Sequence, residues 1–178
     1  MAVIGGDDIV NALQEHLRKD LPGMVERLGL DELGTVQTWQ VLPDPREITA
    51  ARHPAVSVVA AEAEAVERDR DGYSASWSAS VGVFDRGADF QDTQNRIQRW
   101  AKAIRATALL GRCIPGTPFV IRWAGETSDL IPASTDNRTL AGAEVMFDVF
   151  VENALDLGDI RNPAAPPLLS THHTIQPR

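Results

Sequence analysis

The stretch YSASWSASVGV, residues 73–83, alternates apolar and small side chains along its whole length. The apolar residues, from Tyr73 to Val83, all occupy odd positions, and serines and one glycine occupy the even positions. Because successive side chains of a strand point to opposite faces of a sheet, this pattern predicts a β-strand with one apolar face. Its other face, small and uncharged, would let another backbone or side chain approach closely.

The segment before this strand, residues 55–68, predicts its hairpin partner. It reads AVSVVAAEAEAVER, with β-branched residues first and alternating alanine and glutamate after them. The charged run Asp69-Arg70-Asp71-Gly72 then supplies a turn. A calcium loop is the weaker reading of this run, because the later carboxylates of an EF-hand are missing. We therefore expect a long antiparallel hairpin with a charged tip.

The N-terminal segment predicts a first amphipathic helix. Apolar residues recur at helical spacing from Ile9 to Leu17, and an aspartate at position 7 or 8 can cap the start. Leu21-Pro22-Gly23 is expected to end this helix. A second, shorter turn is expected over residues 24–30.

Residues 89–110 predict a longer amphipathic helix, with Asp89 as its N-cap and Gly111 as its stop. Its apolar stripe is expected to pack on the apolar face of the strand at residues 73–83. Each large side chain buried there would contribute about 1.5–3 kcal/mol. The expected core residues are Tyr73, Trp77, Val81, Ile97, Trp100, Ile104, Val145 and Phe147.

Three further strands complete the expected sheet. They read TVQTWQVL, FVIRW and AEVMFDVFV, at residues 35–42, 119–123 and 143–151. A polar loop is expected over residues 124–138. Together the elements predict an α+β domain, residues 1–160, with a mainly antiparallel sheet, a long β-hairpin, and one face covered by the N-terminal and central helices. Residues 161–178 are rich in proline and predict a C-terminal arm or tail.

The last of these strands has apolar groups on both faces, because Met146 and Phe150 lie on its otherwise polar side. Either a helix or a neighbouring subunit could cover that second face. We favour helix packing, since the N-terminal helix needs a surface to cover.

Composition excludes several classes of function. Lys and Arg number 17 against 25 Asp and Glu, so the net charge is -8, and sequence-specific binding of nucleic acid is not expected. The single cysteine, Cys113, rules out an intramolecular disulfide and a cysteine-rich zinc site, and is expected to be a small buried side chain. With no long apolar run and no secretion signal, we expect a soluble intracellular product that does not bind membranes.

The sequence contains no catalytic motif. Nucleotide-binding glycine loops, the HExxH metal pair and the GxSxG nucleophile sequence are all missing. The adjacent His172 and His173 are more simply solvated tail residues. A small hydrolase built on His53, Glu126 and Asp129 would require these groups to converge in a pocket, and the sequence gives no reason to expect it. We therefore predict no enzymatic activity, no cofactor and no metal site.

The order of elements and one sequence pattern resemble the tail terminator, or tail completion, proteins of long-tailed bacteriophages. The pattern spans Tyr73 to Leu109 and runs Tyr-x-x-x-Trp-x-x-x-Val-x-Val, then Arg-Gly-x-Asp, then a helix with Trp-x-x-x-Ile-Arg-x-x-x-Leu. The rest of the domain matches in element order. Head-completion and neck proteins of the same phages have related small folds, so a head-tail adaptor, stopper or other neck protein is the alternative.

The resemblance implies a structural role. Proteins of this family form rings, usually hexameric, that cap the head-proximal end of the tail tube, stop its polymerisation and provide the surface onto which the filled head docks. The implied partners are further copies of the chain, the tail tube protein and a head-completion or neck protein, with genome DNA passing through the lumen. The implied location is the tail or neck of a virion assembled in the host cytoplasm. An acidic ring would keep DNA from adhering to the passage.

Three segments are candidates for contact with neighbouring subunits or partners: the charged hairpin, the polar loop and the proline-rich arm. In a ring, each subunit presents one patch to a different patch of its neighbour. For the hairpin, a solvated protrusion is an equally good reading. The candidate interface residues are Glu64, Arg68, Asp69, Arg70, Asp71, Glu126, Asp129, Leu168 and Leu169.

Overall fold

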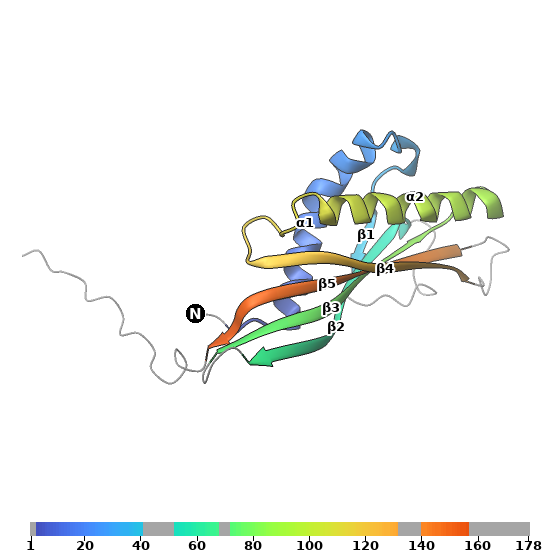
Figure 1. Cartoon of the computed structure of the whole chain (residues 1–178). Helices are drawn as coiled ribbons and strands as arrows, with labels where there is room; N and C mark the ends of the chain where they lie inside the picture. Colours follow the sequence, from blue (N-terminus) through green and yellow to red (C-terminus); the bar gives the residue numbers. More distant parts are fainter. Residues whose placement is uncertain (1–2, 41–51, 68–71, 132–139, 157–178) are drawn as a thin grey trace, which may run out of the picture.

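A computed structural model of the chain describes residues 3–40, 52–67, 72–131 and 140–156 (Figure 1). Its elements are α1 (Gly6–Arg27), the 3-10 helix η1 (Asp31–Leu33), β1 (Thr38–Gln40), β2 (Ala55–Glu67), β3 (Gly72–Asp85), α2 (Phe90–Leu109), β4 (Phe119–Ile131) and β5 (Leu140–Asp156). The predicted hairpin tip and C-terminal arm lie outside the described residues.

The strands form one sheet in the order β1-β2-β3-β5-β4. Strand pairs are antiparallel, except that β1 runs parallel to the start of β2. Figure 1 shows α1 and α2 on the same side of this sheet. The structure therefore confirms the predicted α+β fold, with a long β2–β3 hairpin and one face covered by both helices. Neither described helix has the length and apolar content that a membrane span requires.

The alternation in β3 sets the two faces of the sheet. From Ala75 to Val83 its odd residues are buried beneath the helices. In β2 an extra residue, Ala61, forms a β-bulge. The bulge shifts the alternation by one position, so the apolar side chains before it and the alanines after it share the helix side. Glu62 and Glu64 consequently lie on the opposite side, in register with serines of β3.

The first helix is longer than the sequence predicted. α1 continues through Pro22 and Gly23 to Arg27, although a proline inside a helix removes one backbone hydrogen bond and costs about 3 kcal/mol. The apolar stripe resumes after the proline with Met24 and Val25, and both are buried. Burial of these side chains outweighs the local cost, so the predicted stop and separate short turn are wrong.

The second helix begins as predicted, but after its end the left-handed backbone conformation belongs to Arg112 and not to the predicted stop Gly111. Asp89 is its N-cap, and its carboxylate accepts a hydrogen bond of 2.8 Å from the backbone N–H of Asp92. The helix ends at Leu109, and its buried stripe, which includes Trp100 and Ile104, packs against β3, β4 and β5. α1 lies beside it and covers β2.

Seven of the eight residues expected in the core are buried, and Trp100 and Phe147 are the largest fully buried side chains. Tyr73 is a correction, because it is only partly buried. It lies at the hairpin end of β3, in register with Glu67, beyond the place where the start of α1 approaches Trp77. Neither α1 nor α2, the long helices of the described residues, extends far enough along the sheet to cover it.

The segment predicted as a polar loop after residue 123 continues instead as strand β4 to Ile131. An extra residue, Ala124, forms a second β-bulge there. Because of the shift, Glu126 lies on the helix side of the sheet and Asp129 on the other side. The polar composition that predicted a loop belongs to a strand at the sheet's edge, where most side chains meet solvent.

Other boundaries also differ from the predictions. β1 covers a short part of the predicted strand at residues 35–42, and β5 extends past the predicted strand at both ends. The end of β5 lies next to the start of the domain, since the Ile4 N–H donates to the Ala154 carbonyl oxygen at 3.1 Å. Cys113 is exposed rather than buried, because it lies in the turn between α2 and β4, in an isolated bridge with Val120.

Candidate functional site

The side of the sheet opposite the helices, here called the open face, is the main candidate for contact with another protein. Its centre is the row of small residues in β3, Ser76, Ser78, Ser80 and Gly82. No described helix covers this face (Figure 1). Of the even positions of the opening pattern, Ser78 is exposed and Ser76, Ser80 and Gly82 are half-buried, whereas Ser74 is buried.

A shallow hollow of about 370 Å³ crosses the open face. It is lined by Glu64, Ser76, Arg122, Asp148 and Phe150, which come from β2, β3, β4 and β5. The hollow forms because Ser76 is short, while the residues in register on either side, Glu64 and Phe150, are long. Of its lining residues, Phe150 and Arg122 are of types enriched at protein interfaces, whereas Glu, Asp and Ser are depleted there.

Met146 and Phe150 lie on the open face, and Phe150 is 39% exposed. The N-terminal helix packs on the other face, so the preferred prediction that a helix covers these residues is wrong. The sequence argument failed because both helices share one side of the sheet. The methyl group of Met146 lies close to Gly125, since a Cβ added at Gly125 would be 3.3 Å from it.

The open face is acidic. Glu62, Glu64, Glu144 and Asp148 lie on it, together with one arginine of β4, Arg122. The carboxylates are exposed, and they follow β2 and β5 on both sides of the serine row. A surface of this kind repels nucleic acid and favours a partner with a complementary basic patch.

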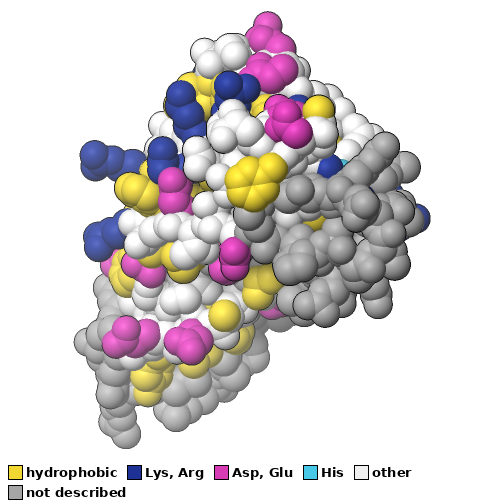
Figure 2. Space-filling model, turned by 90° about the vertical axis from the view of Figure 1, so that its right-hand side faces the viewer, with side chains coloured by type: hydrophobic (Ala, Val, Ile, Leu, Met, Phe, Trp, Pro, Cys, Tyr) yellow, Lys and Arg dark blue, Asp and Glu magenta, His cyan; other side chains and the backbone are white. Residues whose placement is uncertain are grey.

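Cationic side chains gather instead on the outer side of α2. Arg99 pairs with Glu32 at 2.7 Å, and Arg105 pairs with Glu126 at 2.6 Å while lying 4.7 Å from the centre of the Trp123 ring. Figure 2 shows Lys and Arg side chains along one side of the molecule, with Asp and Glu side chains above and below them. Exposed ion pairs contribute about 0–1 kcal/mol each to stability.

The structure separates the predicted interface residues. Glu64 lines the hollow on the open face, and Asp129 is exposed on the same face of β4. Glu126 lies on the opposite face, where Arg105 engages it. The remaining candidates lie outside the described residues: Arg68, Asp69, Arg70, Asp71, Leu168 and Leu169.

The residues of the hydrolase alternative do not converge. Glu126 and Asp129 are on opposite faces of β4, and the His53 ring lies against the Phe84 carbonyl oxygen, with Nδ1 at 3.3 Å, at the start of β2. Within the described residues, no group of three or more His, Cys, Asp or Glu side chains is arranged to hold a metal ion.

A buried polar cluster at the end of β3 was not foreseen from the sequence. The Asp85 carboxylate accepts hydrogen bonds from Arg96 Nε at 2.9 Å and from Trp100 Nε1 at 3.0 Å. The same guanidinium donates to the carbonyl oxygens of Glu32 and Leu33. This cluster connects β3, α2 and η1. The only sign of it in the sequence is that Asp85 continues the odd, buried positions of β3.

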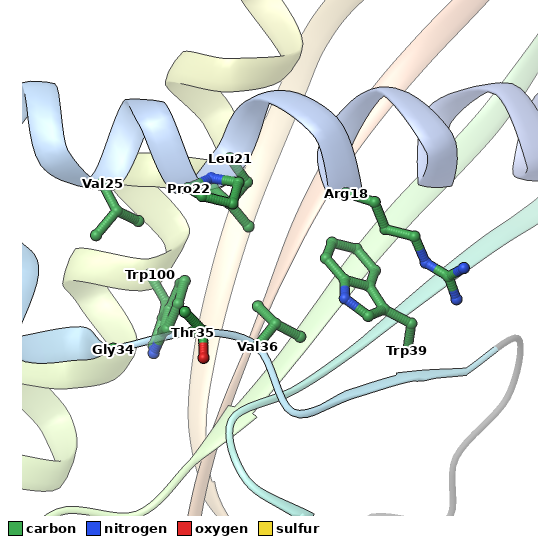
Figure 3. A pocket seen from close by; sticks show the side chains of 9 residues that line it. All are labelled: Arg18, Leu21, Pro22, Val25, Gly34, Thr35, Val36, Trp39 and Trp100. Atoms are coloured by element: carbon green, nitrogen blue, oxygen red, sulfur yellow. The ribbon is translucent and has the colours of Figure 1, made fainter.

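A small apolar cleft of about 140 Å³ opens between α1 and the segment that leads into β1 (Figure 3). Leu21 and Pro22 of α1 form one side, and Trp39 and Val36 form the other. Arg18 lies 5.5 Å from the centre of the Trp39 ring at one end. The cleft has room for one apolar side chain.

His16 joins the two helices. Its Nδ1 lies 2.9 Å from Asp20 Oδ2, and its Nε2 lies 3.1 Å from the carbonyl oxygen of Thr107 in the last turn of α2. Both partners are acceptors, so a neutral imidazole can donate to one of them and an imidazolium to both. The spacing of His16 and Asp20 is visible in the sequence, whereas the contact with Thr107 depends on the helix packing.

Replacing His16 with alanine is expected to lower the free energy of unfolding by about 1–3 kcal/mol, because the buried Thr107 carbonyl loses its side-chain partner. Urea unfolding followed by circular dichroism measures this change. Lys19→Ala, on the exposed side of the same helix, is the control and should change stability by less than about 0.5 kcal/mol. Equal effects of both substitutions would contradict a specific role for His16.

The chain shares its fold with a virion protein. No model of a known protein family matches the sequence, and no curated protein is detectably similar to it. A chain from the virion of a native gene transfer agent particle superposes with a TM-score of 0.55 at 17% identity. The match covers 85% of this chain and 98% of the other. At this identity the likeness shows a common fold.

Proposed function

We propose that the chain is a structural protein of a phage-like virion, and that it forms a ring at the head-proximal end of a tail tube, as tail terminators do. The observation that carries the proposal is the fold shared with a chain of a gene transfer agent virion over most of both chains. The sequence pattern from Tyr73 to Leu109 supports the narrower role of tail terminator.

The two sides of the sheet differ in charge, as suits a ring whose two walls face different surroundings. The open face is acidic, and the outer side of α2 carries Arg99, Lys102 and Arg105. A ring is built by head-to-tail contacts between two different surfaces of the chain, and such contacts close when the rotation between subunits allows it. No catalytic step is needed for this role.

A head-tail adaptor, stopper or other neck joint is the second candidate. The similar chain is described by its particle and not by its position in it, and either position in a virion would use the same fold. The two roles differ in what happens when the protein is missing, which gives a direct test.

An early stop codon in this gene is expected to produce overlong tail tubes without heads, visible by electron microscopy of the lysate. Growth continues past its normal length because nothing caps the tube. A plasmid copy of the gene, supplied as the control, should restore normal particles. Tails of normal length beside unattached or leaking heads would identify a neck joint instead. Normal infectious particles would contradict both structural roles.

A further inference from the structure

Within the described residues, parts of both outer edges of the sheet have no strand beside them. β1 pairs with β2 only along Ala55–Ser57, and within the described residues no strand pairs with the outer side of β2 over residues 58–65. β4 pairs with β5 on its inner side, and over residues 122–128 the described chain offers no strand on its outer side. Uncovered strand edges are templates for pairing with another chain.

The directions of these two edges suit each other. β2 is antiparallel to β3, β3 to β5, and β5 to β4, so β4 runs antiparallel to β2 in the same subunit. A second copy, rotated about an axis roughly parallel to the strands, places its β4 beside β2 of the first copy. The two edges would then meet as an antiparallel ladder, which is the more stable arrangement per residue.

The covered parts of the two edges lie at opposite ends of the sheet. β1 covers the start of β2, and the turn after α2 covers the start of β4, where the Ile121 N–H donates to the Arg112 carbonyl oxygen at 2.9 Å. Since β2 and β4 run in opposite directions, the uncovered stretches are diagonally offset. Copies joined through them are displaced along the strands. A ring with this stagger closes when its strands are tilted to the ring axis, as the strands of closed barrels are.

The side chains at the two edges permit close approach. The outer half of β2 exposes the small residues Ala61, Ala63 and Ala65. Its charged residues Glu62 and Glu64 lie on the same face as Arg122 of β4, so opposite charges can meet across the contact. Each of the two edge strands carries a β-bulge, at Ala61 and Ala124. Bulges increase the local twist and curvature that a continuous, closed sheet requires.

We propose that β2 of one copy pairs antiparallel with β4 of the next copy, so that a single β-sheet runs through all subunits of the ring. The existence of a ring rests on the proposed function, and the inference specifies the contact that builds it. In this arrangement the acidic open face lines one wall of the ring, and α1 and α2 lie on the other wall.

Chemical cross-linking between the two edges tests this contact. In the full chain with Cys113→Ser, cysteines replace Ala63 in β2 and Ser128 in β4; both positions are exposed and lie on the helix side of the sheet. A short thiol-reactive cross-linker is added, and the products are separated on a denaturing gel. We expect a ladder of products larger than a dimer from the double variant and no such ladder from either single variant.

The matched control pairs Ala63→Cys with Gln98→Cys, an exposed position on α2 away from both edges. It measures cross-linking by random collision, and circular dichroism verifies that every variant is folded. A ladder no stronger than this control would overturn the inference. A strong dimer from Ala63→Cys alone would also overturn it, because it would reveal a two-fold contact between β2 strands.

The outcomes separate this inference from the proposed function. If electron microscopy shows rings but the gel shows no cross-linked ladder, the strand pairing is rejected and the proposed ring is retained. A ladder from a protein whose loss leaves infectious particles unchanged would support the strand pairing and reject the virion role.

Discussion

Replacing Asp85 with alanine is expected to lower the free energy of unfolding by about 3–5 kcal/mol, the usual effect of removing one partner from a buried ion pair. Asp85 is 2% exposed and pairs with Arg96 at 2.8 Å. Without the carboxylate, the guanidinium would remain in a site where its side chain is only 17% exposed. The Trp100 N–H would also lose its acceptor in the centre of the core.

Urea unfolding, followed by tryptophan fluorescence and by circular dichroism, measures this loss. Asp148→Ala removes an exposed carboxylate from the open face and is the control, with an expected change within about 0.5 kcal/mol. Asp85→Asn keeps an acceptor for Trp100 but removes the charge, so its effect isolates the ion pair. A loss below about 1 kcal/mol for Asp85→Ala would mean that the cluster of Asp85, Arg96 and Trp100 does not hold the fold together.

Replacing Gly87 with alanine is expected to destabilise the domain by about 3 kcal/mol, near the upper end of the usual cost of overpacking. Gly87 lies in the tight turn between β3 and α2, where its N–H donates to Thr93 Oγ1 at 2.9 Å. A Cβ at this position would lie 2.5 Å from the backbone nitrogen of Thr93 and 2.8 Å from the carbonyl carbon of Asp92. It would also meet the Asp92 carboxylate, so the first turn of α2 would have to move.

Gly23→Ala provides a control with the opposite sign. Gly23 lies inside α1, and a Cβ there would meet nothing within 4 Å. Because alanine is the better helix former, this change should stabilise the protein by about 0.5–1 kcal/mol. Thermal unfolding of both variants gives the comparison. If Gly87→Ala unfolds at the same temperature as the unmodified protein, the turn is more adaptable than its geometry indicates.

The sequence predicts those elements whose local pattern and tertiary environment agree. The alternation from residue 73 to residue 83 and the capped helix after Asp89 both identify the buried side, because burial follows the periodicity in each case. The prediction fails at Pro22, where burial of the following apolar side chains outweighs a local helix breaker. It also fails after Trp123, where a bulge hides the alternation of an edge strand.

The candidate site was harder to predict than the fold. The serines of β3 predict a face of small side chains. The sequence does not predict that both helices pack on the other face, because this depends on tertiary contacts. The same holds for Met146 and Phe150, whose apolar character predicted a covering helix and whose position is on the open face. The cluster around Asp85 joins residues far apart in the sequence, and no spacing rule connects them.

The exposed position of Cys113 gives the protein a natural attachment point for a spectroscopic probe. The sequence has no other cysteine, so a spin label would attach at one place in every copy without any substitution. In a closed ring of labelled copies, the ratio of nearest to next-nearest label distances depends only on the number of copies. Pulsed electron paramagnetic resonance of the labelled assembly would therefore count its subunits in solution.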